Sequence, residues 1–305
     1  MILAALHYPS FQTLSDAVGL GAIYALMAVG IGLVFGVLRL VNFAYGQLVM
    51  AGAYTLAFTS GWPVWQSILA CFGVVVALSL AMDLVVFRPL RGQSPAVMLV
   101  TTFAVAFLLQ SIALIVDLRD NTLGEVAASI TSLNEPLTVH GVDIRKITLV
   151  AVAVAVFSLV VLVLLLNRTT IGLHTRAAAA DFRTARLLGV RANRVIAFAV
   201  VVSGLLAAAV AVMMTVQFPL VTPDFALHDT IIVLVGVVVG GIDRLWTATL
   251  GGFTIGFASG VINGVLPTEN TVYLPSVLFV LVILVLLLRP AGLFAWGRQA
   301  AVDRV

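Results

Sequence analysis

The sequence predicts an all-α polytopic membrane protein with about eight to nine transmembrane helices. Hydrophobic residues make up 62% of its 305 residues and charged residues only 10%, whereas soluble domains are about a quarter charged. Charge-free stretches near 20 residues long recur along the chain, and this is the length that crosses the hydrocarbon core as a helix. We therefore expect one membrane domain and no separate soluble module.

Eight of these stretches are predicted spans, at residues 17–38, 42–60, 64–87, 96–116, 147–167, 195–216, 247–266 and 273–289. Each stretch is flanked by polar residues, prolines or turns. The first four lie between Asp16 and Arg39, between Asn42 and the turn TSGWP, between that turn and FRPLRG, and between Pro95 and Asp117. The last four lie between Lys146 and Arg168, between Arg194 and Gln217, between Arg244 and Pro267, and between Tyr273 and Arg289. Asp83 lies inside the third stretch, and we expect it to pair with Arg88 or Arg91 because an unpaired charge is costly there.

Residues 217–241 predict a broken or re-entrant helix. Only 13 uncharged residues separate Asp229 from Asp243, which as a helix cover about 20 Å of a core about 30 Å thick. Pro219 and Pro223 precede this run. Irregular backbone is tolerated at membrane depth only where protein or a water-filled cavity satisfies it. The break therefore predicts a translocation pathway, with a short tilted helix as the alternative.

The positions of the basic residues predict the orientation. With the N-terminus outside, the short segment crossing as a ninth span and the C-terminus cytoplasmic, all but three of the 16 Lys and Arg residues face the cytoplasm, the exceptions being Arg119, Arg145 and Lys146. This asymmetry follows the positive-inside rule. Residues 117–146 then form an extracytoplasmic loop and residues 168–194 a cytoplasmic loop.

The motifs of several enzyme classes are missing from the sequence. Lys146, the only lysine, is not part of a phosphate-binding GxxxxGK[ST] loop, so we expect no ATP hydrolysis by this chain. The four histidines show no metal-ligand spacing, and no GxSxG nucleophile motif occurs. We therefore predict a non-catalytic protein with no cofactor and no metal site.

The cytoplasmic loop contains the stretch TRAAAADFRTARLLGV, whose composition predicts a short amphipathic helix. Phe182 and Leu187 or Leu188 would share one side, with Arg183 and Arg186 turned away. Gly189 would end the helix as a C-cap. Such a helix could lie on lipid or dock into a groove on a partner.

This loop resembles that of bacterial ABC-importer permeases of the branched-chain amino acid type, the Liv-type H subunits. The resemblance implies that the loop forms a coupling helix in the cleft of an ATPase. The residues it assigns to coupling are Ala179, Ala180, Asp181 and Gly189, and we add Phe182, Arg183, Arg186 and Leu187 from the predicted helix.

Further stretches resemble the same family in the same order. They include RLVNFAYGQLVMAGAY, DLVVFRPLRG, VVVGGIDRLWTATLGG and LLLRPAGLF, and together they cover nearly the whole chain. The resemblance implies a single transmembrane permease domain over residues 1–305 in the bacterial cytoplasmic (inner) membrane. It also implies a second permease subunit, two ABC ATPase subunits and an extracytoplasmic substrate-binding protein as partners, within the lipid bilayer and with no nucleic acid.

Two positions depart from the family pattern. The family usually has NFAHGE or NFAHGD where this chain has NFAYGQ, so Tyr45 replaces a histidine and Gln47 a carboxylate. The solute therefore stays open between a branched-chain amino acid, urea, an amide and another small polar molecule.

Five polar residues in or next to the predicted spans are candidates for the lining of the translocation path: Asn42, Tyr45, Gln47, Gln110 and Gln217. If the second span is straight, the first three lie near its cytoplasmic mouth. Asn42 could instead cap that helix, and Gln110 could hydrogen-bond between helices.

A stand-alone channel or facilitator for a small neutral solute is the competing function. It would share the apolar helices and the amide-bearing side chains. A passive channel has no need of the alanine-rich cytoplasmic helix, which favours the permease subunit of an ATP-driven importer.

Overall fold

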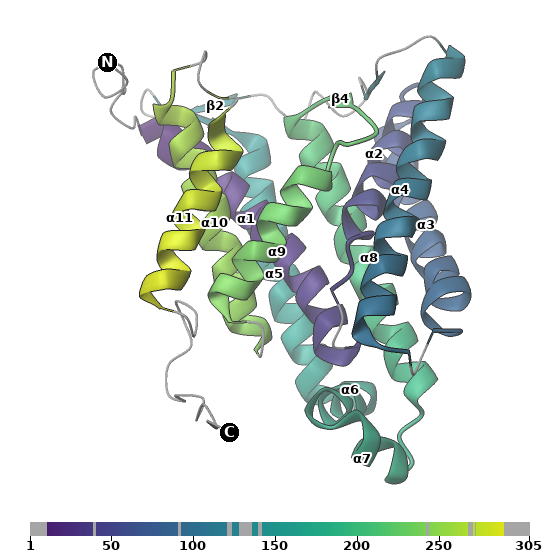
Figure 1. Ribbon diagram of the computed structural model, residues 1–305. Helices are drawn as coiled ribbons and strands as arrows, with labels where there is room; N and C mark the ends of the chain where they lie inside the picture. The colour runs from purple at the N-terminus through teal and green to yellow at the C-terminus, as the bar shows by residue number, and fades with distance from the viewer. Residues whose placement is uncertain are drawn as a thin grey trace.

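The computed structural model describes residues 11–38, 41–90, 93–120, 124–127, 136–139, 142–241, 244–267, 271 and 273–289. These residues form a bundle of helices (Figure 1). The helices are α1 (Phe11–Leu38), α2 (Tyr45–Phe58), α3 (Val64–Met82), the π-helical turn Asp83–Phe87, α4 (Pro95–Asp120), α5 (Lys146–Arg168), α6 (Thr170–Ala180), α7 (Phe182–Leu187), α8 (Ala192–Gln217), α9 (Leu227–Gly240), α10 (Leu245–Val265) and α11 (Leu274–Leu288).

The chain is a mostly helical, polytopic membrane protein. Within the described residues, six helical segments are long and apolar enough to cross a membrane. They correspond to α1, α3 with the π-helical turn, α4, α5, α8 and α10. The apolar helices α9 and α11 are shorter. Each predicted span coincides with one helix to within a few residues, while the total of eight to nine crossings stays a prediction.

The loops at one end of the bundle contain four short strands, so the all-α prediction was wrong in this detail. Strand β1 (Glu125–Val126) pairs with β4 (Leu220–Val221), and β2 (Pro136–Val139) pairs with β3 (Val142–Arg145), both antiparallel. Such open ribbons need hydration at their free edges, which restricts them to regions outside the hydrocarbon core. We call this the strand end, and the opposite end the α6/α7 end (Figure 1).

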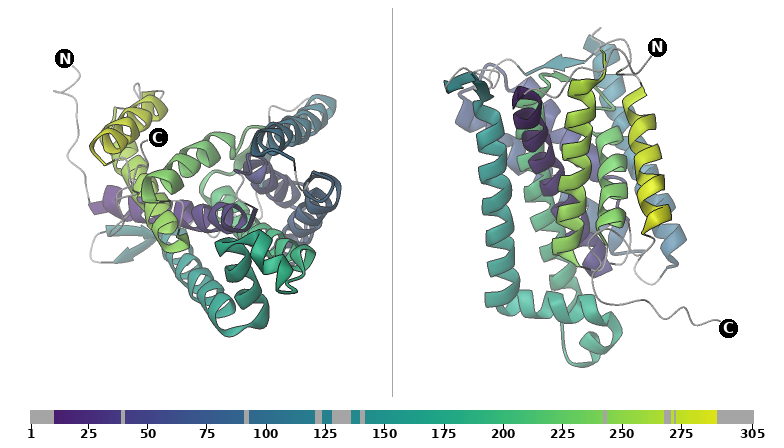
Figure 2. Two further views of the ribbon diagram at one scale, coloured as in Figure 1. Left: turned by 60° about the horizontal axis from the view of Figure 1, so that its bottom comes forward. Right: turned by 90° about the vertical axis from the view of Figure 1, so that its left-hand side faces the viewer.

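Helix α1 runs through the middle of the bundle, as Figure 2 shows in the view with the α6/α7 end turned forward. Nearly all of its residues from Gly19 to Val34 are buried. Helix α2 is also buried on almost every side, whereas α5 and α11 expose rows of Leu, Val, Ile and Phe side chains. These outer faces suit contact with lipid, and the central helices are left to carry polar groups.

The segment between α8 and α10 is broken, as predicted for residues 217–241. Helix α8 ends at Gln217, β4 follows, and α9 has only 14 residues, about 21 Å of helix against a core about 30 Å thick. Gly241 ends α9 with a φ of 107°, a left-handed conformation that side chains disfavour. The re-entrant course of α9, with a short tilted span as the alternative, stays a prediction.

Asp83 forms the predicted ion pair with Arg88. The Arg88 Nε lies 3.1 Å from Oδ2 of Asp83, whose side chain is fully buried. The π-helical turn brings the two residues together, because the Arg88 N–H donates to the Asp83 carbonyl five residues back. The pair thus has a structural role at the end of α3.

Candidate functional site

Helix α2 begins in the interior of the bundle. A Cβ atom at Gly30 of α1 would lie 2.8 Å from Cζ of Tyr45, the first residue of α2. Gly30 is eight residues, about 12 Å, from the end of α1 at Leu38, and Ser203 in the middle of α8 donates to its carbonyl at 2.9 Å. The second span is therefore not a straight helix from its first residue, because the non-helical residues 41–44 precede α2, which begins beside the middle of α1.

Contacts with α4 hold residues 41–44 in place. Phe43 donates its N–H to Thr102 Oγ1 at 3.4 Å, and its ring stacks on Phe103 with centroids 3.9 Å apart. Oδ1 of Asn42 accepts the Ala44 N–H at 3.1 Å. Asn42 thus shapes the turn before α2, while Ala44 occupies the N-cap position without a side-chain bond.

Tyr45 and Gln47 are fully buried at the start of α2. Among the described residues, neither the Tyr45 hydroxyl nor either amide atom of Gln47 has a hydrogen-bond partner. An unpaired buried polar group costs about 1–3 kcal/mol, and polar residues at membrane depth commonly mark solute pathways. These two side chains are the strongest candidates for a site that is satisfied in another state of the protein.

Helix α9 begins beside the start of α2. A Cβ atom at Gly46 would lie 2.7 Å from the carbonyl oxygen of Ala226 and 3.1 Å from Cβ of Thr230. The two short helices therefore present their N-terminal N–H groups, and the positive ends of their dipoles, in the interior. Broken helices of this kind bind the anionic groups of solutes in transporters.

The other two path candidates lie on different helices. Helix α4 faces α2 through Thr102 and Asp117, and Gln110, half-buried and seven residues before Asp117, lies on nearly the same face of α4 as Asp117. Gln217, at the end of α8, lines a void of about 10 Å³ together with Asp16. Asn42, Tyr45 and Gln47 are in the chain that leads into and begins α2.

Two phenol–carboxylate hydrogen bonds were missed by the sequence reasoning. Tyr24 of α1 donates to Asp229 of α9, and Tyr54 of α2 donates to Asp117 of α4 at 2.8 Å. The partners are 205 and 63 residues apart, so no local pattern joins them. The available signal was an acid at the edge of an apolar run, since a carboxylate there requires a donor.

A cavity of about 300 Å³ opens near the strand end, between α1, α9, α10 and the chain around β4. We call it the strand-end cavity. It combines polar and apolar groups, and its lining residues are Leu20, Tyr24, Phe218, Leu220, Thr222, Asp224, Phe225, His228, Asp229, Ser259, Asn263 and Leu274. Its volume is at the lower end of the range for small-molecule sites.

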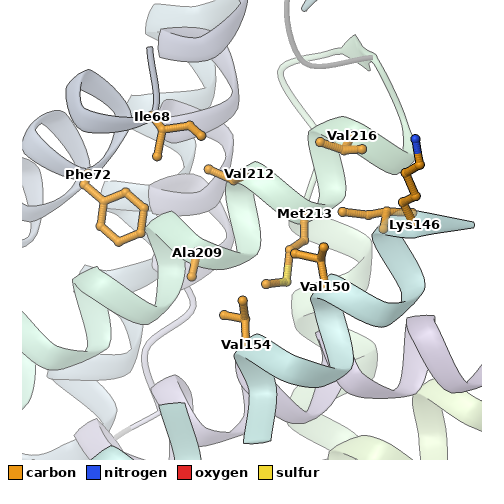
Figure 3. A pocket seen from close by; sticks show the side chains of 10 residues that line it. Ile68, Phe72, Lys146, Val150, Val154, Ala209, Val212, Met213 and Val216 are labelled. Carbon is orange, nitrogen blue, oxygen red and sulfur yellow. The ribbon is translucent and has the colours of Figure 1, made fainter. Parts of the chain in front are cut away.

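A second cavity, of about 370 Å³, lies between α3, α5 and α8. Figure 3 shows its lining of aliphatic side chains, Phe72 and Met213, with the amino group of Lys146 at one edge. Apart from Lys146, the lining side chains are apolar. This cavity suits a hydrocarbon chain and offers a polar solute almost nothing to bind.

The predicted coupling helix is two helices in the structure. Asp181 interrupts the helical path with an extended backbone between α6 and α7. Its carboxylate accepts the Thr184 N–H at 3.1 Å and the Thr184 hydroxyl, so it caps the start of α7. Gly189 follows with a φ of 88°, as expected for a helix-ending glycine. The aspartate cap explains why one predicted helix becomes two.

The tip of this loop exposes apolar side chains at the α6/α7 end. Leu187 and Leu188 are 84% and 81% exposed, whereas Ala185 is buried. Ala179 is partly buried. The side chains of four predicted coupling residues lie outside the described part of the chain: Ala180, Phe182, Arg183 and Arg186.

A family model and curated relatives match most of the chain. The family described as "branched-chain amino acid transport system / permease component" matches residues 13–288. The high-affinity branched-chain amino acid transport system permease protein BraD of Pseudomonas aeruginosa is 30% identical over 94% of this chain and 95% of its own length. The corresponding protein LivH of Escherichia coli K12 is 27% identical over 92% and 94%. A solved structure described as PsaBC from Streptococcus pneumoniae in complex with Fab aligns with a TM-score of 0.46 at 13% identity, covering 90% of this chain and 92% of that one.

Proposed function

The chain belongs to the branched-chain amino acid transport system permease family, and from this membership we propose that it is the transmembrane permease subunit of an ATP-driven importer. The observation that carries the proposal is the pair of buried, unpartnered side chains, Tyr45 and Gln47, where α2 and α9 begin. A wholly structural bundle gains nothing from these orphaned groups. A transport protein gains a surface that can solvate a polar molecule once the bundle opens.

The protein lies in the cytoplasmic (inner) membrane, and in our proposal its α6/α7 end faces the cytoplasm. The loop that contains α6 and α7 carries a dense group of basic residues: Arg168, Arg176, Arg183, Arg186, Arg191 and Arg194. At the strand end, Arg145 is balanced by Asp16 at 3.7 Å. The positive-inside rule supports this orientation.

In the proposed pathway, solute passes the starts of α2 and α9. Tyr45 and Gln47 supply a hydroxyl and an amide, Asn42 sets the turn that positions them, and the two helix N-termini offer N–H donors. In this proposal Gln110 and Gln217 line other points of the path. Alternating access would expose the interior groups to each side in turn.

ATP hydrolysis in this proposal belongs to two separate ATPase subunits. Helix α7 ends in the exposed Leu187 and Leu188, which offer an apolar anchor for a groove on a partner. A second permease subunit would complete the pathway, and a substrate-binding protein would deliver solute at the strand end.

The solute class follows from the relatives. BraD and LivH are named as high-affinity branched-chain amino acid permeases, and we propose a branched-chain amino acid or a related small polar solute for this chain. Tyr45 and Gln47 replace groups usual in the family, so these positions are where the solute preference would differ.

Purification of the tagged chain from its native host tests the proposal. We expect two ATPase subunits, a second permease and a substrate-binding protein to copurify, and mass spectrometry of the ligand released from the binding protein to find a branched-chain amino acid. Recovery of the chain without any ATPase, under conditions that preserve other importers, would count against the proposal.

A further inference from the structure

Asp229 is a carboxylate at membrane depth whose environment supplies little positive charge. It lies in the first turn of α9, where the helix dipole contributes only a weak attraction to an anion. Among the described residues, its one hydrogen bond comes from the neutral hydroxyl of Tyr24. A carboxylate offers about four acceptor positions, so this arrangement leaves room for a further donor.

Tyr24 holds that carboxylate in a defined direction. The phenol is buried at 2% exposure and donates to Asp229, and Ser259 of α10 lines the same cavity. Tyr24 is therefore held by its burial and by the bond to Asp229. It acts as a positioning residue that aims the Asp229 carboxylate, and all three side chains line the strand-end cavity.

The rest of the cavity matches the other parts of a small amino acid. Leu20, Phe225 and Leu274 supply apolar surface, while His228 offers a donor for a carboxylate. None of the lining residues is Lys or Arg. Because its charged lining residues are the carboxylates Asp224 and Asp229, the cavity attracts a cation more strongly than an anion.

We propose that the strand-end cavity is an entry site for the translocated amino acid, in which Asp229 binds the ammonium group of the zwitterion. This inference rests on the proposed function and adds to it a site separate from Tyr45 and Gln47. The solute would meet Asp229 first, after its release at the strand end, and then move toward Tyr45 and Gln47 at the start of α2. An uncharged solute such as urea would gain little from this carboxylate.

Protection from cysteine modification tests the site without relying on transport. The only natural cysteine, Cys71, is buried, so a cysteine placed at Asn263, which is exposed and lines the cavity, reports on occupancy. In the assembled complex carrying N263C, we expect millimolar L-leucine to slow the reaction of the introduced thiol with 2-sulfonatoethyl methanethiosulfonate at least threefold. The same carbon skeleton without the ammonium group, 4-methylpentanoate, should give no protection.

Two further variants make the test specific. Asp229→Asn, added to N263C, should abolish protection by leucine, whereas Asp16→Asn, the same change at the strand end outside the cavity, should leave it intact. A cysteine at the exposed Ser60 should react at one rate with or without leucine. Equal protection by leucine and 4-methylpentanoate, or full protection in Asp229→Asn, would overturn the proposal.

Transport then separates this inference from the proposed function. In proteoliposomes with all partner subunits, Asp229→Asn should reduce ATP-driven leucine uptake at least tenfold while the ATPase subunits still copurify. Uptake within twofold of wild type would overturn the entry site and leave the importer function standing.

A strict sodium requirement in wild type that disappears in Asp229→Asn would also overturn the proposed entry site, because Asp229 would then bind a metal cation. Should Asp229→Asn fail to assemble, Tyr24→Phe provides the test, with a raised KM for leucine and an unchanged maximal rate expected.

Discussion

Polar side chains in this protein divide into those with partners and those without. Asp83, Asp117 and Asp229 each accept a hydrogen bond from a residue on a neighbouring turn or helix. Tyr45 and Gln47 are as deeply buried and have no partner among the described residues. Paired groups stabilise the observed conformation, whereas unpaired groups favour a conformation in which they can bind water or solute.

Replacement of Gln47 by leucine should therefore stabilise the resting protein and impair its transport. Gln47→Leu removes an unpaired buried amide, which costs about 1–3 kcal/mol, so we expect a higher melting temperature in detergent and at least a fivefold fall in uptake. Tyr45→Phe should act in the same direction with a smaller effect. Gln66→Leu, on the half-buried start of α3, is the matched control and should leave uptake unchanged. A Gln47→Leu protein that transports normally would remove this side chain from the path.

The ion pair of Asp83 and Arg88 predicts an asymmetry between two charge-removing variants. Arg88→Gln removes the Arg88 cation from beside a fully buried carboxylate, whereas Asp83→Asn leaves an arginine that is 42% exposed and can reach water. A buried charge that loses a partner is more destabilising than an exposed one. We expect thermal unfolding to show the larger loss for Arg88→Gln, and equal losses would argue against this account of the pair.

Elements of the fold meet most closely at glycines. At Gly46, α2 approaches the start of α9 so closely that a Cβ atom would lie 2.7 Å from the Ala226 carbonyl oxygen. At Gly73 of α3 the same atom would find nothing within 4 Å. Small residues let helices approach in membranes, so Gly46 fixes the relation of the two short helices that frame the proposed path.

Substitution by alanine at these two glycines should have opposite results. Gly46→Ala forces α2 and α9 apart, an overpacking that costs about 1–3 kcal/mol, and we expect lower thermal stability and reduced uptake. Gly73→Ala should be neutral or stabilising by up to about 1 kcal/mol, since alanine favours a helix over glycine. Normal uptake by the Gly46→Ala protein would show that the close contact is dispensable.

The α6/α7 element makes a separate prediction about coupling. Leu187→Ser removes an apolar side chain that is 84% exposed, so it should leave the fold intact and reduce copurification of the ATPase subunits. Asp181→Ala should also weaken that association, because α7 loses its N-terminal cap, whereas Asp181→Asn retains a capping side chain. Unchanged ATPase binding in Leu187→Ser would place the contact elsewhere.

The whole molecule shows which features a sequence can predict. Charge-free runs located every long helix because the thickness of the membrane fixes their length, and Pro219 and Pro223 located the break after α8. The interior start of α2 was not predictable, since it depends on contacts of Phe43 with Thr102 and Phe103 that link distant parts of the chain.

The candidate site was predictable only in part. The departures from the family pattern pointed to Tyr45 and Gln47, which the structure buries without hydrogen-bond partners among the described residues, whereas the roles of Gln110 and Gln217 stay predictions. Polarity inside an apolar span can be recognised locally. The choice between a path-lining group and an interhelical hydrogen bond depends on tertiary packing, as the bond from Tyr24 to Asp229 shows.

Flux into liposomes tests the central claim most directly. The purified chain would be reconstituted alone, and in parallel with its permease partner, the ATPase subunits and the substrate-binding protein, with radiolabelled leucine outside. We expect uptake only in the complete complex, only with the loaded binding protein outside and only while ATP is hydrolysed by the ATPase subunits. Solute flux through the chain alone, without ATP, would contradict this account and establish a channel or facilitator instead.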